Sequence, residues 1–170
     1  MFTKTDIEKY FIAEKSGGLF LIIIGIAAIG LAIVLFFFVK ASWHKGAALP
    51  LILLGILQLT VGYVVYNRSD KDRLQNVYAY DMNPTELKAK EIPRMEKVNK
   101  NFSIFLYTEA ILFIAAVVVF FFLKNDDTKS FWVGFCLALA IEALICLAFD
   151  TQAHSRAKRY LEGMKIFSIK

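Results

Sequence analysis

The chain has 170 residues, of which 58% are hydrophobic and 21% are charged, and it contains 16 Phe. A soluble domain is usually about 45–50% apolar and breaks its apolar runs with polar residues at a helical or strand period, so this composition excludes an ordinary soluble domain. The formal net charge of +5 does not require a nucleic-acid partner, because anionic lipid headgroups also attract Lys and Arg.

The N-terminal segment, residues 2–16, is expected to form a short interfacial helix that lies on the inner membrane surface. Thr5 and Glu8 have the spacing of a capping box at its start. Three residues share one face of this helix: Ile7, Tyr10 and Phe11. The glycine pair at 17–18 is then expected to let the backbone turn into the membrane.

Four apolar runs follow, and each has the roughly 20 residues that a helix needs to cross the hydrocarbon core. They predict an all-α membrane protein, an antiparallel bundle of four transmembrane helices with spans at residues 17–39, 47–66, 102–123 and 131–149. The first span does not read as a cleavable signal peptide, because its apolar stretch is longer than that of a signal and acidic residues precede it.

The polar segments are expected to extend the spans into the cytoplasm, within a single membrane domain that comprises the whole chain. Residues 67–101 predict a helical hairpin, in which Asn83 separates two helices and caps the second, and Pro93 opens a further helix that enters the third span. Residues 150–170 predict a cytoplasmic tail helix that continues the fourth span until Gly163.

Lys and Arg are distributed unevenly along the chain. Sixteen of the 20 lie in the N-terminal segment, in residues 67–101 and after Phe149, whereas the two short loops within the paired spans hold four. By the positive-inside rule, both termini and the central segment are expected in the cytoplasm, and the protein in a bacterial inner membrane. Trp43 and Trp132 then lie at the outer ends of spans, where an aromatic belt belongs.

The two halves of the chain are similar when they are shifted by 84 residues. The run Phe36–Lys40 aligns with Phe120–Lys124, and Gln58 aligns with Glu142. A tandem two-helix repeat would give two similar hairpins related by an axis along the membrane normal. The alternative, that two membrane hairpins resemble each other in composition only, stays open.

Two carboxyl groups and several other polar side chains are expected at one depth in the bundle. This layer comprises Gln58, Thr60, Thr108, Glu109 and Glu142. Both glutamates are seven residues from the inner end of their span, or about 10 Å at the helical rise, and are expected to face each other. One interpretation is that the layer joins the helices by hydrogen bonds, and the other is that the carboxyls bind a proton or cation on a pathway.

No catalytic, cofactor or metal site is predicted, and no enzyme activity is expected. His44 and His154 are expected on opposite sides of the membrane, and Cys136 and Cys146 are too far apart on one helix for a disulfide. The sequence lacks HExxH, CxxC and P-loop motifs. A basic run follows the fourth span, and three of its residues are candidates for contact with anionic lipid: Arg156, Lys158 and Arg159.

The glycine pair at 17–18, the segment Pro93–Lys97 and the two short outer loops resemble the layout of uncharacterised small four-span proteins of bacterial inner membranes. That group includes immunity proteins, which guard bacteria against toxins that act on their own membranes. The resemblance implies a non-enzymatic membrane binding protein, with a membrane-inserted toxin or another membrane protein as its partner. It implies no functional residue.

Two other functions stay open. The first is a proton- or cation-linked channel or transporter subunit, built as a homo-oligomer, with Glu109 and Glu142 in the pore. The second is a structural or regulatory subunit of a larger membrane complex. Neither needs a nucleic acid, and no cofactor is expected for either.

Overall fold

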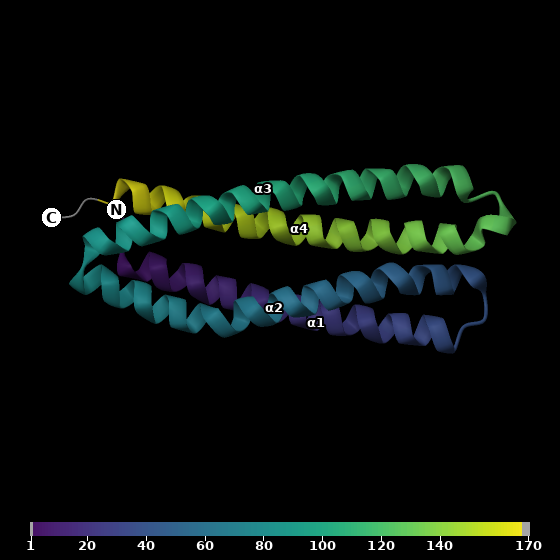
Figure 1. The fold of residues 1–170 in the computed structure, drawn as a ribbon, viewed down its shortest axis with the longest axis horizontal. Coiled ribbons are helices and arrows are strands. Elements are labelled where there is room, and N and C mark those ends of the chain that lie inside the picture. Colours follow the sequence, from purple (N-terminus) through teal and green to yellow (C-terminus); the bar gives the residue numbers. More distant parts are fainter. Residues whose placement is uncertain (1, 168–170) are drawn as a thin grey trace.

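The computed structural model describes residues 2–167, and it is helical apart from short connections (Figure 1). Its elements are α1 (Lys4–Phe37), α2 (Ser42–Met82), α3 (Pro84–Leu123), the short 3-10 helix η1 (Asp127–Lys129) and α4 (Ser130–Ile166). Each of the four α-helices is long and apolar enough to span a membrane. The prediction of an all-helical chain with four apolar helices is therefore confirmed.

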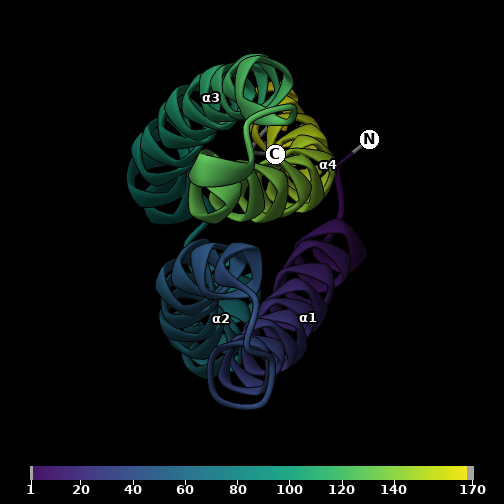
Figure 2. The ribbon, with the colours of Figure 1, turned by 90° about the vertical axis from the view of Figure 1, so that its right-hand side faces the viewer.

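The helices form two hairpins. α1 packs along α2, and α3 packs along α4, with the loops of both hairpins at the same end of the molecule (Figure 1). Contact between the hairpins is made mainly by α2 and α4, whereas α1 touches α4, and α2 touches α3, only to a small extent (Figure 2). α2 and α4 therefore form the centre of the molecule.

The N-terminal segment differs from the expectation of a separate interfacial helix. α1 runs without a break through Gly17 and Gly18, and neither glycine has a positive φ. The apolar face seen in the sequence packs inside the protein, where Ile7 and Phe11 are almost completely buried. Packing against the ends of the other helices therefore takes the place of contact with a membrane surface.

The first helix also begins earlier than the capping box at Thr5 and Glu8 suggested. The Asp6 carboxylate accepts hydrogen bonds of 2.8 Å from both the backbone N–H and the hydroxyl of Thr3. Thr3 is the residue that precedes the first helical turn, so Thr3 and Asp6 form the cap.

The start of α3 agrees with the sequence, but its interior does not. The Asn83 side chain accepts a hydrogen bond of 3.2 Å from the backbone N–H of Glu86, and Pro84 occupies the first helical position. Pro93 does not open a new helix, because α3 continues through it. One backbone hydrogen bond is lost there, and the packing of the buried Met95 keeps the segment helical.

α4 continues beyond Gly163, which the sequence indicated as its end, and stops at Ile166. Residues 168–170 of the predicted tail helix lie outside the described residues. Gly163 matters for a different reason: a Cβ atom there would lie 2.6 Å from Cδ2 of the Phe2 ring. The glycine therefore makes room for the N-terminal segment.

Glycines set the distance between α1 and α2. A Cβ atom on Gly18 would lie 2.9 Å from the carbonyl oxygen of Gly62, and one on Gly25 would lie 2.7 Å from that of Gly55. Both distances are too short for any side chain, so the two backbones touch directly at two levels, one above the other. Close backbone approach through small residues is the usual way in which helices associate in lipid.

α2 and α4 approach each other in the same way near the hairpin loops. A Cβ atom on Gly46 would lie 1.8 Å from the Phe131 carbonyl oxygen, and one on Gly134 would lie 1.8 Å from the Trp43 carbonyl oxygen. Each helix thus presents a glycine to the backbone of the other. This contact fixes the two hairpins against each other at the end that carries both loops.

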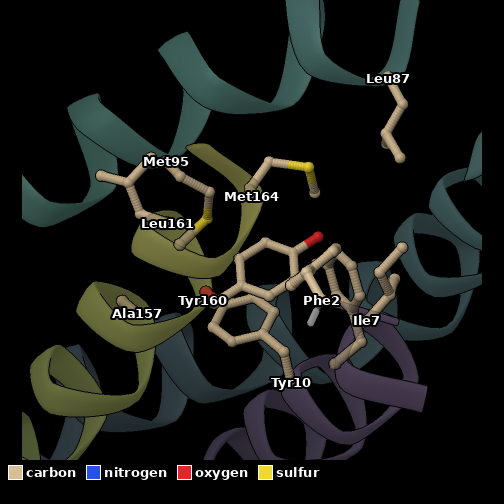
Figure 3. Packing of buried hydrophobic residues seen from close by; sticks show 10 residues of the cluster. Phe2, Ile7, Tyr10, Leu87, Met95, Ala157, Tyr160, Leu161 and Met164 are labelled. Atoms are coloured by element: carbon tan, nitrogen blue, oxygen red, sulfur yellow. The ribbon is translucent and has the colours of Figure 1, made fainter. Parts of the chain in front are cut away.

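The largest buried apolar cluster lies at the opposite end, near both termini (Figure 1), and Figure 3 shows its side chains. It comprises Phe2, Ile7, Tyr10, Phe11, Leu87, Met95, Ala157, Tyr160, Leu161 and Met164. Tyr10 and Tyr160 stack at its centre with ring centroids 4.2 Å apart. The helices are therefore joined by large side chains outside the apolar spans and by small ones within them.

Candidate functional site

Gln58 on α2 and Glu142 on α4 form a buried polar contact between the two hairpins. The Gln58 side-chain amide donates a hydrogen bond of 2.8 Å to the Glu142 carboxyl, and both residues are at least 95% buried. The same amide nitrogen lies 3.3 Å from the Cys146 sulfur and can donate its second proton there. The two positions that the shift of 84 residues aligns are thus direct partners.

Glu109 on α3 does not lie against Glu142. Its neighbour is the carboxyl group of Asp150, which follows the last residue of the fourth apolar run. Two ionised carboxylates can only accept hydrogen bonds and repel each other, but one shared proton lets one group donate to the other. The structure therefore contains two polar pairs, Gln58–Glu142 and Glu109–Asp150, in place of one face-to-face pair of glutamates.

Sequence reasoning did not include Asp150 in the polar layer, because it lies one residue beyond the predicted span. A signal for it does exist: Glu142, Cys146 and Asp150 recur every four residues along α4. Such a spacing places side chains on neighbouring parts of one helix face. Cys146 lies between Glu142 and Asp150 on this face and contacts Gln58 of the first pair.

The two threonines that the sequence assigned to the polar layer bond within their own helices. Thr60 donates a hydrogen bond of 2.8 Å to the carbonyl oxygen of Ile56, and Thr108 donates one of 2.9 Å to that of Ile104. Both threonine bonds are exposed on the protein surface. The structure thus brings Gln58 and Glu142 together and does not bring the threonines to them.

A cavity of about 260 Å³ opens beside Asp150 and is lined by all four helices. Its charged lining residues are Glu14, Arg68, Asp150 and Arg156, and its apolar ones include Leu21, Val65, Phe105 and Phe149. Because the polar residues flank the ends of the apolar runs that lie away from the hairpin loops, the cavity lies at the boundary between the charged and the apolar parts of the helices.

An ion pair between Glu14 and Arg68 forms one wall of this cavity, with its N–O distance at 2.9 Å. Burial raises the pKa of the Glu14 carboxyl, and the Arg68 guanidinium lowers it in part. The Ser69 hydroxyl approaches the same carboxyl at 3.5 Å. The pair joins α1 to α2 just outside the spans.

A second ion pair lies within α3, beside the apolar cluster, and joins the buried Glu91 to the half-buried Arg94. Arg94 donates hydrogen bonds of 2.7 and 2.6 Å to the two oxygens of Glu91, which is 3% exposed, and its guanidinium lies 5.5 Å from the centroid of the Phe11 ring. The Tyr160 hydroxyl faces the same carboxylate, and burial raises the pKa of Tyr160. The fork geometry neutralises the buried Glu91 charge within α3, and the contact of Arg94 with Phe11 joins this part of α3 to α1.

The basic run after the fourth span divides into two groups. Arg156 and Arg159 line a groove between α1 and α4, whereas Lys158 is exposed and lines none of the cavities described here. The groove also contains Lys9 of α1, which the sequence gave no reason to join to them. The grouping depends on how α1 packs against α4.

Within residues 2–167, no group of three or more His, Cys, Asp and Glu side chains could hold a metal ion. Cys136 and Cys146 are both free thiols, in agreement with the spacing argument.

Comparison of the chain with protein-family models, with curated proteins and with solved structures gives no match.

Proposed function

We propose that this chain is a non-enzymatic binding protein of a bacterial inner membrane, built as an antiparallel four-helix bundle with both termini in the cytoplasm. The orientation is supported by charge, since fifteen of the 19 Lys and Arg residues within residues 2–167 lie at the end of the molecule opposite to the two hairpin loops. The buried cluster of Figure 3 and its ion pairs then form a small cytoplasmic domain.

The observation that carries the proposal is the exposure of α3. Of its most apolar 18 residues only 6% are buried, against 33% in α2 and in α4. Its exposed apolar residues include Ile104, Phe105, Ile111, Ile114, Val118, Phe121 and Phe122. A helix of this kind can take a second apolar helix along its length, which would bury the surface that lipid otherwise covers.

The exposed side of α3 also carries a polar group that could give specificity. Tyr107 is 74% exposed and lies close to the level of Glu109. A partner helix with a hydrogen-bonding side chain at that level could bond to Tyr107, which would fix its position along α3 in addition to the fit of the apolar surfaces. A membrane-inserted protein toxin is a partner with this chemistry, so immunity to such a toxin is the specific function that we propose.

Protection of the membrane potential tests immunity. Cells that express the chain are expected to stay polarised at doses of the toxin that depolarise cells without it. The double variant Ile111→Ala with Ile114→Ala on α3 is expected to lower the toxin dose that the cells withstand by about tenfold or more. A tenfold change corresponds to a loss of roughly 1.4 kcal/mol of binding free energy. The matched control is Ile23→Ala with Ile26→Ala on α1, where the same residue types at the same spacing are also exposed.

The outcomes separate the possibilities. If both double variants lose protection equally, the loss comes from removing apolar surface in general. That result would contradict recognition by α3. Wild-type cells that are depolarised at the same dose as cells without the chain would reject immunity to that toxin.

A second candidate is a proton- or cation-linked subunit that uses Glu109 and Glu142. It is supported by the cavity beside Asp150, from which a proton can reach Glu109 and then the vicinity of Cys146 and Glu142. On the loop side of Glu142, however, none of the four apolar runs contains Asp, Glu, His, Lys or Arg. A complete pathway through one chain would therefore lack charged groups in its outer half.

Proton flux into liposomes decides on this candidate. If it is correct, the reconstituted chain conducts protons, Glu142→Gln abolishes the flux, and Glu96→Gln in the cytoplasmic part leaves it unchanged. If the chain is a binding protein only, wild type, Glu109→Gln and Glu142→Gln give the flux of protein-free liposomes.

A further inference from the structure

A groove of about 590 Å³ runs between the beginning of α1 and the end of α4. Its α1 wall includes Asp6, Lys9 and Tyr10, and its α4 wall includes Arg156, Arg159 and Tyr160. The floor is aromatic, because Tyr10 and Tyr160 stack on each other. The groove exists because α1 and α4 make little direct contact.

The lining of this groove carries more positive than negative charge. Lys9, Arg156 and Arg159 are cationic, and Asp6, whose carboxylate accepts two hydrogen bonds from Thr3, is the one acidic residue of the lining. Arg159 uses only its Nε, which donates to the Ser155 carbonyl oxygen at 3.3 Å. Across residues 2–167, neither Lys9 nor Arg156 forms an ion pair with a carboxylate. The groove therefore has an excess of positive charge that a bound anion would balance.

The position of Arg156 relates the groove to the membrane. Its Nη2 atom lies 3.6 Å from the point where a Cβ of Gly17 would be, and the Phe149 ring lies 3.1 Å from the same point. Gly17 begins the first apolar run and Phe149 ends the fourth, so the guanidinium lies at the edge of the apolar region. Side chains on α4 lean toward its N-terminus, which here means toward the membrane.

We propose that this groove binds the phosphate of an anionic phospholipid headgroup, with Arg156 on the phosphate and with Arg159 and Lys9 on the outer part of the headgroup. A guanidinium fork matches two phosphate oxygens, and the headgroup level is where Arg156 lies. A soluble phosphate ester has the same chemistry, and the test separates the two. The inference rests on the membrane-spanning arrangement but not on binding by α3, so each can fail alone.

The test is a lipid titration of the purified full-length chain, followed by native mass spectrometry. Phosphatidylglycerol is expected to bind at least about tenfold more tightly than phosphatidylcholine, the effect expected of two or three favourably placed basic groups. Arg156→Gln is expected to remove most of this preference, and Lys9→Gln part of it. Lys158→Gln is the matched control, because Lys158 belongs to the same basic run and does not line the groove.

Three results would overturn the proposal. The first is equal binding of the two lipids. The second is that Lys158→Gln weakens phosphatidylglycerol binding as much as Arg156→Gln does, which would indicate diffuse surface charge. In the third, glycerol 1-phosphate alone would bind as tightly as phosphatidylglycerol, which would assign the groove to a soluble ligand. Circular dichroism of the variants confirms that any loss of binding occurs in folded protein, and Lys9→Gln, on an exposed residue, serves if Arg156→Gln fails to fold.

Discussion

At the scale of single residues, charged side chains form ion pairs in the parts of the helices that lie outside the apolar runs. The buried Glu91 pairs with the half-buried Arg94 beside the apolar cluster, and Glu14 and Arg68 form a partly exposed pair at the edge of the spans. A buried charge is tolerated only with a partner, and removing one member leaves the other uncompensated. The pairs therefore make the helix ends opposite to the hairpin loops sensitive to substitution.

Replacing Arg68 with Gln is expected to make stability depend more strongly on pH. The pKa of Glu14 is already raised by burial, and loss of the guanidinium raises it further. A carboxyl group with a raised pKa binds its proton more tightly when folded, so stability falls as the pH rises above its ordinary value of 4.5. The variant is expected to lose about 1.5–3 kcal/mol at pH 7 and less at pH 5.

Chemical denaturation followed by circular dichroism at the two pH values measures this effect. Lys90→Gln is the control, because the Lys90–Glu86 pair is exposed, and its loss is expected to leave stability nearly unchanged at either pH. An Arg68→Gln penalty of the same size at pH 5 and pH 7 would refute the assigned role of Glu14.

The start of α1 gives a second prediction at this scale. Asp6→Ala removes both hydrogen bonds to Thr3 and is expected to cost about 1 kcal/mol in the first turn, whereas Glu8→Ala is expected to have little effect. Amide hydrogen exchange of residues 4–7 measures the difference. Faster exchange in the Glu8 variant than in the Asp6 variant would support the capping box of Thr5 and Glu8 that the sequence suggested.

At the scale of the elements, the two hairpins are packed differently. The first is closed by the glycine contacts between α1 and α2, and the second holds the pair of carboxyl groups, Glu109 and Asp150. Under the shift of 84 residues, Gly25 corresponds to Glu109 and Gly62 to Cys146. Positions that allow close packing in one hairpin thus carry polar groups in the other.

Two glycines of α1 that look equivalent in the sequence are expected to respond differently to Ala. Gly25→Ala places a Cβ 2.7 Å from the Gly55 carbonyl oxygen and is expected to cost about 1–3 kcal/mol by overpacking. Gly30→Ala meets nothing within 4 Å and is expected to leave stability unchanged or to raise it by up to about 1 kcal/mol. Thermal unfolding in detergent compares them, and similar midpoints would contradict the packing of α1 on α2.

The sequence was sufficient to predict the four apolar helices and the cap at Asn83, because both depend on local composition and spacing. It was not sufficient at Gly17 and Gly18 or at Pro93. The glycines stay helical because α2 packs directly on Gly18, and the exposed Pro93 stays helical between two residues that are buried against the rest of the protein, Glu91 and Met95. In each case, contacts from a distant part of the chain decide against the local preference.

At the scale of the whole molecule, the membrane part is held by α2 and α4, and α3 is the helix with the most surface left open. Counting residues from the span ends placed Glu109 and Glu142 at one level, but Glu109 lies beside Asp150, which is about 12 Å along α4 from Glu142. The register between α3 and α4, and the direction in which each polar group faces, could not be predicted in this way. Over the eight residues from Glu142 to Asp150, a helix face turns by about 80°. Glu142 thus faces α2, whereas Asp150 lies beside Glu109 of α3.

Site-specific photo-cross-linking in intact cells tests most directly whether α3 binds a membrane partner. A cross-linker at Ile111 of α3 is expected to yield one discrete protein adduct that Ile114→Ala weakens and Ile23→Ala does not. The same group at the equally exposed Ile26 of α1 is expected to yield lipid adducts only. The same protein adduct from both positions, or lipid adducts alone at Ile111, would contradict binding by α3.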